Sequence, residues 1–275
     1  MKWTNPGHQL DELGQRYLKI ENLLIYGTDG IALDAVNFIN WLGVAEDFCI
    51  ANTIDFNDTL KNPRFSPENT IVVLTNPEQA DIAATIKNLG YNHIFYLSPA
   101  HNRRDNFIQN FACIWLMYKH GKLLSHWTNF LTTSRCNLNC YKCLNFYSFI
   151  DNPKDVTFDE FKYHIDIMFS KFDYLYSLHF TGGEPLLVEE LPKFIMYLAD
   201  NYKNRIYDFF VITNATIMPS VELIDSMRLI DGHFHLDDYS DTVLSSKVVQ
   251  IQSFLDNHGM KYVTNKPSYW YDLGI

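Results

Sequence analysis

The chain has 275 residues, of which 47% are hydrophobic and 15% aromatic, so it has enough apolar surface for a sizeable core, which argues against disorder. Its formal net charge is −10 and it has no Lys/Arg cluster; such a surface repels a phosphate backbone, so no nucleic-acid partner is expected. The first residues lack the apolar core of a signal peptide and no run of about 18 apolar residues exists, so we expect a cytoplasmic protein without a membrane partner.

The amino-terminal part of the chain, at about residues 20–100, alternates between patterns typical of strands and of helices. Short apolar runs predict buried strands, and apolar residues at helical spacing predict helices between them. The predicted strands are Asn22–Tyr26, Phe48–Ala51, Thr70–Leu74 and His93–Leu97, with helices over Gly30–Leu42 and about Pro77–Leu89. This order implies a small parallel sheet. A connecting helix over Arg103–His120, ended by Gly121, completes a predicted domain at residues 1–120.

A glycine-containing turn, Tyr26-Gly27-Thr28-Asp29-Gly30, follows the first predicted strand. It resembles the nucleotide-binding turn of Rossmann-like modules attached to sugar-modifying enzymes. The dinucleotide pattern G-x-G-x-x-G is not met, and Asn52 stands where an acid would end the second strand. We therefore expect a Rossmann-like α/β domain and favour a structural or substrate-recognition role over an active nucleotide site.

The alternation of strands and helices restarts near Trp127. The predicted strands are Trp127–Thr133, Leu175–Thr181, Asp208–Thr213, His233–Asp237 and Met260–Thr264, and the helices are about Phe158–Phe172, Val188–Tyr202, Ser220–Ile230 and Leu244–Asn257. Five such steps predict a partial (β/α) barrel over residues 121–275, with ligands at the carboxyl ends of its strands. A sixth strand would come next where the chain stops, so either the barrel is incomplete and open or the chain is truncated.

Three of the five cysteines lie within eight residues, just after a predicted strand, as Cys136, Cys140 and Cys143. Closely spaced thiolates can hold three irons of a cubane cluster, which leaves the fourth iron open to a substrate or cofactor. The alternative is a zinc knuckle completed by a histidine, but no histidine lies within about ten residues on either side. The other two cysteines, Cys49 and Cys113, lie alone in apolar stretches and are expected to be small buried hydrophobes.

A second motif, Thr181-Gly182-Gly183-Glu184-Pro185, ends the next predicted strand. Paired glycines at this place allow a ligand to approach the backbone closely, and the backbone carbonyls can accept from an ammonium group. The alternative is an ordinary strand-to-helix turn in which Pro185 opens a helix. The two motifs on consecutive strands of one series are a stronger signal than either alone.

Together these motifs resemble the radical S-adenosylmethionine (SAM) superfamily, and the matching part runs from about Asn129 to Gly274. The resemblance implies that the three cysteines bind one [4Fe–4S] cluster, and that the methionine amino and carboxylate groups of SAM chelate its open iron. The implied SAM-binding residues are Gly182, Gly183, Glu184 and Pro185 for the methionine amino group, Asn214 in a Thr-Asn-Gly-like turn in which Ala215 replaces the glycine, and Asp237 or Ser240 for the ribose hydroxyls.

The sequence departs from the family pattern at the adenine site. The family commonly has an aromatic residue just before the third cysteine, whereas here Lys142 occupies that position and Tyr141 lies one residue earlier. The later, often glycine-rich adenine motif is not recognisable around Lys261–Pro267. No cysteine follows Cys143, so the auxiliary clusters of SPASM or twitch extensions are not expected.

The chemistry implied by the resemblance is reductive cleavage of SAM and abstraction of a hydrogen atom from a substrate, with an electron supplied by a donor such as a flavodoxin or ferredoxin. We expect a small metabolite as substrate, such as a nucleotide-linked sugar or cell-surface precursor. One alternative is a modified peptide or an activated partner protein. Another is a binding or scaffold protein that keeps the cluster but does not turn over.

Several polar residues outside the two motifs are lesser candidates. His233 and His235 alternate on one strand face, where they could hold a second metal or act as polar filling. Asp237 and Asp238 are adjacent on a strand and therefore point to opposite faces. His179 either reaches the cavity or packs in the core.

Overall fold

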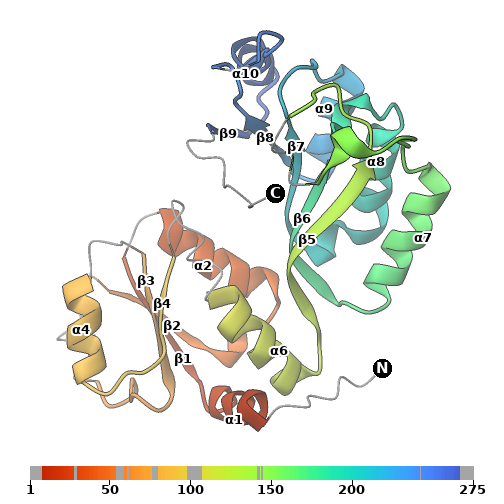
Figure 1. The fold of residues 1–275 in the computed structure, drawn as a ribbon. Coiled ribbons are helices and arrows are strands. Elements are labelled where there is room, and N and C mark those ends of the chain that lie inside the picture. The colour runs from red at the N-terminus through yellow and green to blue at the C-terminus, as the bar shows by residue number, and fades with distance from the viewer. Residues whose placement is uncertain are drawn as a thin grey trace. The chain divides into compact units, whose positions relative to one another are not determined.

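The computed structural model describes residues 8–27, 30–53, 59–60, 62–75, 80–97, 107–140, 143, 145–241 and 243–266. The chain forms two compact units, Met1–His126 and Trp127–Ile275, each with its own sheet (Figure 1). The predicted start of the helix at Pro77, the first residues of the connecting helix, and Thr28 and Asp29 of the glycine turn lie outside the described residues.

The amino-terminal unit contains, within its described residues, a four-stranded sheet of order β2-β1-β3-β4. The pairs β1–β2, β1–β3 and β3–β4 are parallel, as the alternation of strands and helices predicts. The strands are β1 Asn22–Tyr26, β2 Cys49–Thr53, β3 Thr70–Leu74 and β4 Ile94–Tyr96, with helices α2 Gly30–Trp41 and α4 Ala80–Asn88 and a short 3₁₀ turn at Ala45–Asp47. The side chains of β3 are all buried, which explains its uninterrupted apolar run.

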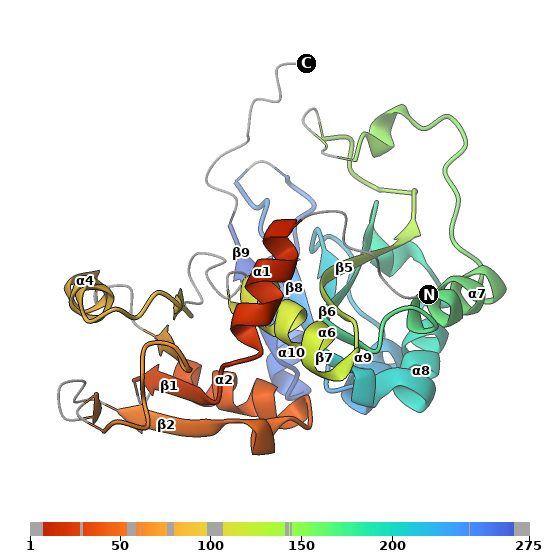
Figure 2. The same ribbon diagram turned by 90° about the horizontal axis from the view of Figure 1, so that it is seen from below.

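Two helices, α1 at His8–Tyr17 and α6 at Cys113–His120, pack together beside this sheet (Figure 2). Helix α1 has no counterpart among the predicted elements. The Tyr118 hydroxyl donates to Asp11 at 2.5 Å, and Gly14 leaves room for the Tyr118 ring, which lies 2.5 Å from where a Cβ would stand. A π-helical turn at Ile108–Ala112 leads into α6. Gly121, with φ 64°, ends α6 as predicted.

The carboxyl-terminal unit contains, in the described part of the chain, a five-stranded sheet of order β5-β6-β7-β8-β9. The pairs β6–β7, β7–β8 and β8–β9 are parallel. The strands are β5 Leu124–Thr133, β6 Tyr174–Gly182, β7 Ile206–Thr213, β8 His233–Asp237 and β9 Tyr262–Asn265. The α/β fold class and the partial barrel are therefore confirmed, since β5 and β9 remain edges and the described strands do not close into a barrel.

One face of this sheet is covered by helices (Figure 1). The helices are α7 Phe158–Phe169, α8 Leu191–Tyr202, α9 Val221–Leu229 and α10 Val248–Asn257. The rings of Phe161 and Phe194 stack with centroids 4.4 Å apart and join α7 to α8 in the core. Helix α7 begins at a capping box. The Thr157 side chain accepts a hydrogen bond from the Glu160 main-chain N–H, and the Glu160 side chain accepts one from the Thr157 main-chain N–H. The helices thus hold the strands so that their carboxyl ends come together.

No helix in the described ranges combines the length and apolar character required to cross a membrane.

Candidate functional site

The segments that follow β5, β6, β7 and β8 meet at one pocket. The pocket is lined by Cys136, Leu138, Cys140, Cys143, Asn145, Tyr147, Thr181, Gly182, Gly183, Ile212, Thr213, Asn214, Asp237 and Tyr239. All three cysteines, both glycines, Asn214 and Asp237 belong to the set expected from the sequence. The other three residues of that set lie elsewhere: Glu184 and Pro185 are buried beside the pocket, and Ser240 is in an exposed turn.

The three thiols of the pocket affect one another electrostatically. Burial raises the pKa of the Cys136 and Cys140 thiols, and each pKa is raised further by the negative charge of the neighbouring sulfurs. Across the described residues, no three His, Cys, Asp or Glu side chains converge closely enough for one metal ion. Three thiols that share one pocket, two of them with a raised pKa, fit a cationic polynuclear iron centre, which neutralises thiolate charge. The donor set therefore fits a [4Fe–4S] cluster.

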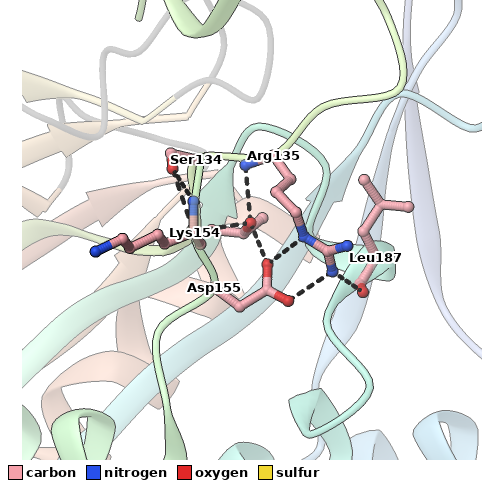
Figure 3. A network of polar contacts seen from close by, with 6 residues as sticks. Ser134, Arg135, Lys154, Asp155 and Leu187 are labelled. Carbon is pink, nitrogen blue, oxygen red and sulfur yellow. Dashed lines mark hydrogen bonds and ion pairs between the residues drawn. The ribbon is translucent and has the colours of Figure 1, made fainter. Parts of the chain in front are cut away.

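Arg135, immediately before Cys136, closes the base of the segment that carries the cysteines, residues 136–153, which we call the cysteine loop (Figure 3). Its Nε and Nη2 donate to the two carboxylate oxygens of Asp155 at 2.7 and 2.5 Å, and Nη2 also donates to the Leu187 carbonyl at 2.8 Å. Asp155 follows the loop, so this two-pronged ion pair joins both ends of the loop to the turn after β6.

The main chain supports the same closure. Thr133 and Asp155 form an antiparallel bridge, the Thr133 hydroxyl donates to the Asp155 carboxylate at 2.6 Å, and Ser134 bonds to Lys154 through its main chain and hydroxyl (Figure 3). Burial opposes ionisation of Asp155, but the bonds from Arg135 and Thr133 outweigh it and hold the pKa of this carboxyl below its usual value. The two ends of the cysteine loop are therefore fixed to each other.

Replacing Arg135 with lysine should loosen the cysteine loop. Lysine keeps the charge but cannot bond both Asp155 oxygens and the Leu187 carbonyl in one plane. We expect the free energy of unfolding to fall by about 1 kcal/mol, since the pair is partly exposed, and iron to dissociate several-fold faster from the reconstituted protein. Chelator-challenge kinetics measure this, with Arg228→Lys, which alters an exposed ion pair on α9, as the control. Equal iron loss from both variants would contradict the role of Arg135.

The two glycines after β6 provide a close approach, but to another strand. Gly182 has φ +147°, and a Cβ there would stand 2.4 Å from the Thr133 carbonyl oxygen; a Cβ on Gly183 would stand 1.9 Å from that of Arg135. Main-chain bonds of 2.8 Å run from Gly183 N to Thr133 O and from Glu184 N to Arg135 O. The absence of side chains thus lets the turn after β6 lie against the start of the cysteine loop, while both glycines still line the pocket.

Glu184 is fully buried and its carboxylate joins two strand ends. It accepts from Leu186 N at 3.0 Å, from the Thr213 hydroxyl at 2.7 Å and from Asn214 N at 2.8 Å. Burial raises the pKa of Glu184 to about 7, and the three hydrogen bonds work against that rise. A 3₁₀ turn then begins at Pro185 and spans Pro185–Leu187. The glycine motif is therefore also a strand-to-helix turn, the alternative considered in the sequence analysis. Glu184 holds the end of β7 in place beside the turn after β6.

The turn after β7 connects to the cysteine loop through amide side chains. Asn214 Nδ2 donates to Asn137 Oδ1 at 3.0 Å and lies 3.9 Å from the Cys136 sulfur, and Thr216 bonds to both asparagines. Ala215 has φ 53° in the buried turn. This left-handed conformation explains the glycine of the family pattern, because a Cβ there costs about 1–2 kcal/mol. Here alanine accepts that conformation, and its carbonyl takes a 2.7 Å bond from Lys247 N.

Several lining residues were not among the expected site residues. Thr181 and Thr213 lie at the ends of β6 and β7, and each belongs to a motif in the sequence without having been given a role in the site. Ile212, Tyr147 and Tyr239 come from β7, from the cysteine loop and from the segment after β8. The only sequence signal for these three residues is their nearness to a motif residue. Tyr141 and Lys142, which bear on the adenine contact, lie outside the described residues.

The histidines form a layer across β6, β7 and β8. His235 and His179 stack on the two faces of Phe210 with centroid distances of 3.7 and 3.8 Å, and His233 Nε2 lies 3.0 Å from His235 Nε2. His179 is buried between Asn129 and Ser177, at 3.0 and 2.9 Å. Burial lowers the pKa of His235 to about 4, so its ring is neutral near pH 7. These contacts agree with polar filling beneath the pocket.

Comparison with known families identifies the class of domain that carries this site. Residues 130–244 match the sequence model of the Radical SAM superfamily. The matched segment contains the cysteine loop, the two glycines and Asn214, and it ends after Asp237. The chain therefore contains a radical SAM domain, and enzymes of that superfamily use a [4Fe–4S] cluster and SAM.

Curated relatives match the chain over shorter stretches. The chain is 41% identical over 87 residues to an uncharacterized protein of Methanocaldococcus jannaschii, a match that covers 31% of this chain and 29% of that protein. It is 33% identical over 90 residues to a probable GTP 3′,8-cyclase of Methanococcus aeolicus, covering 31% and 28% of the two chains. It is 36% identical over 90 residues to a GTP 3′,8-cyclase of Sulfurimonas denitrificans, covering 32% and 27%. The matches thus span less than a third of each relative.

Among solved structures, a crystal structure of Streptococcus suis SuiB bound to the precursor peptide SuiA shows a weak similarity. The TM-score is 0.38 with 14% sequence identity, over 68% of this chain and 44% of that chain.

Proposed function

We propose that this chain is a radical SAM enzyme that binds one [4Fe–4S] cluster through Cys136, Cys140 and Cys143 and cleaves SAM reductively to abstract a hydrogen atom from a small metabolite. The pocket is the observation that carries the proposal. It gathers residues from the ends of four strands, and those residues include all three cysteines of the first motif and both glycines of the second.

The residues of the pocket divide the work of such an enzyme. The cysteines are the cluster ligands, and a bound cluster with SAM supplies the one-electron cleavage chemistry. The carbonyl groups of Gly182 and Gly183 are proposed to accept hydrogen bonds from an ammonium group. In a trans peptide each carbonyl points away from the N–H of the next residue, and Gly183 N and Glu184 N bond to the carbonyls of Thr133 and Arg135. Asp237, whose pKa is raised by burial, accepts from Asn265 at 3.4 Å and lines the same pocket. Its carboxylate suits the hydroxyl groups of a ribose.

The substrate class rests on the relatives. Two of them are named GTP 3′,8-cyclase, a name that describes chemistry on a nucleotide, and this supports a small nucleotide-linked metabolite for the present chain. The electron would come from a donor such as a flavodoxin or ferredoxin. A modified peptide or a non-catalytic cluster-bearing scaffold are the outcomes that the experiment below separates from this proposal.

The test is anaerobic reconstitution with iron and sulfide, followed by iron counting and a 5′-deoxyadenosine assay with SAM and dithionite. Wild-type protein should bind about four irons per chain and release 5′-deoxyadenosine. A cluster without release would favour a scaffold. Colourless protein that binds zinc would overturn the proposal, and faster release with peptides than with nucleotides would move the substrate to peptides.

Replacing Cys140 with serine should abolish the brown iron–sulfur absorbance and the release of 5′-deoxyadenosine, because a cubane held at two corners is not retained. Cys113→Ala is the matched control. Cys113 begins α6 in the other unit, and burial raises the pKa of its thiol to about 12, so it is a poor ligand. Iron retention by Cys140→Ser equal to that of Cys113→Ala would count against the ligand assignment.

A further inference from the structure

Tyr147, in the cysteine loop, follows a backbone turn of uncommon conformation. Phe146 N donates to the Cys143 carbonyl at 3.1 Å, and Phe146 itself adopts the left-handed conformation, with φ 55° and ψ 28°. A non-glycine residue pays about 1–2 kcal/mol for this conformation. The turn sends the chain back after the third cysteine, and the next residue, Tyr147, then lines the pocket with Cys136, Cys140 and Cys143.

The hydroxyl of Tyr147 is buried and has no hydrogen-bond partner among the described residues. A buried polar group without a partner costs about 1–3 kcal/mol. Burial raises the pKa of Tyr147, and the negative charges of Cys143 and Cys136 raise it further. The hydroxyl therefore stays protonated at neutral pH, and Tyr147 lines the same pocket as the three cysteines.

The second tyrosine of the pocket, Tyr239, is arranged differently. Its hydroxyl hydrogen-bonds to the carboxylate of Asp237. The Tyr239 hydroxyl is thus already bonded to the Asp237 carboxylate after β8. The Tyr147 hydroxyl is available to donate to a group that occupies the pocket.

We propose that the Tyr147 hydroxyl donates a hydrogen bond to a sulfur of the [4Fe–4S] cluster, on the side of Cys143, and thereby raises the reduction potential of the cluster. This inference rests on the proposed cluster. Hydrogen bonds to the sulfurs stabilise the extra negative charge of the reduced state, which is one way in which proteins set these potentials. Tyr147 is a positioning residue in this role, because it acts through the cluster and does not react.

The experiment is an anaerobic redox titration of the reconstituted full chain, without SAM or substrate, followed by electron paramagnetic resonance of the reduced cluster. Tyr147→Phe should keep the same iron content but show about a tenfold lower ratio of reduced to oxidised cluster at a given potential, which equals about 59 mV for one electron. Tyr163→Phe, which alters an exposed ring on α7, should titrate like the wild type. Incorporation of 3-fluorotyrosine at position 147, a more acidic donor, should shift the ratio in the opposite direction.

Opposite shifts of the phenylalanine and 3-fluorotyrosine proteins support the inference, since a purely structural role would not produce them. An unchanged potential in either protein with its cluster intact overturns it. If Tyr147→Phe loses its iron, the 3-fluorotyrosine protein alone decides the question. Failure of the wild type to bind iron would instead refute the proposed function, so the two failures are distinguishable.

Discussion

Gly183→Ala should destabilise the carboxyl-terminal unit and cost the protein most of its iron. The new Cβ would stand 1.9 Å from the Arg135 carbonyl oxygen and 3.0 Å from Cys136 N, and neither backbone atom can rotate away. The turn after β6 and the start of the cysteine loop must therefore separate, which breaks the 2.8 Å bond from Glu184 N to Arg135 O. We expect a loss of about 3 kcal/mol in the free energy of unfolding of the apo-protein. Urea unfolding and iron counting after reconstitution measure the two effects.

Gly30→Ala is the matched control for this substitution. Gly30 begins α2, and nothing lies within 4 Å of the position a Cβ would take there. Its replacement should leave iron binding unchanged and alter stability by less than about 1 kcal/mol, with stabilisation expected because alanine has less freedom in the unfolded chain. Iron binding and unfolding of Gly183→Ala equal to those of Gly30→Ala would contradict the close contact between Gly183 and the backbone of Arg135.

Glu184→Gln should lower the stability of the apo-protein, and the loss should depend on pH. An amide has one acceptor oxygen, so its NH₂ group would face one of the three donors that Leu186, Thr213 and Asn214 direct at the carboxylate. An unsatisfied buried donor costs about 1–3 kcal/mol. The end of β7 should loosen with it, so SAM affinity of the reconstituted variant should fall as well.

The pH dependence follows from the raised pKa of this acid. The folded state keeps the Glu184 proton up to about pH 7, whereas the unfolded chain releases it near the ordinary value of 4.5. This group therefore stabilises the fold most below about pH 4.5, and that contribution is lost as the pH rises to about 7. Glutamine has no such contribution, so the gap in unfolding free energy between wild type and variant should narrow from pH 5 to pH 7.5. Urea titrations at both values measure it.

A gap that widens with pH would mean that Glu184 is stabilised in its ionised form and that burial does not dominate. Glu12→Ala is the control, since Glu12 is exposed on α1 and its loss should change stability by less than about 0.5 kcal/mol at either pH. The pH response of His235 is present in wild type and variant alike and cancels in the difference.

The order of the elements and the location of the site follow from local patterns in the sequence. Strand and helix periodicity predicts the parallel arrangement of both sheets, because burial of alternate or i, i+4 side chains depends on near neighbours in the chain. The spacing of Cys136, Cys140 and Cys143 and the pair Gly182-Gly183 lie at strand ends, and parallel strands bring such ends to one edge. The pocket gathers them as that rule predicts.

Other features depend on contacts between distant residues, which periodicity does not encode. Nothing in the sequence pairs Arg135 with Asp155, and nothing predicts that the buried Glu184 carboxylate accepts hydrogen bonds from the end of β7. Helix α1 has no counterpart among the predicted elements although its own sequence is amphipathic, and in the fold it packs on α6.

By itself, the sequence determined the chemistry that this protein can offer: three thiols, a glycine pair and a series of parallel strands, all properties of residues close together in the chain. The tertiary structure alone decided which groups support that chemistry. Gly183 is needed for contact with the Arg135 backbone, Ala215 takes a left-handed turn, and the Tyr147 hydroxyl has no partner among the described residues, although Tyr147 lines the pocket with the cysteines. The physical reason is that burial, close contact and hydrogen-bond satisfaction exist only once distant segments of the chain have packed together.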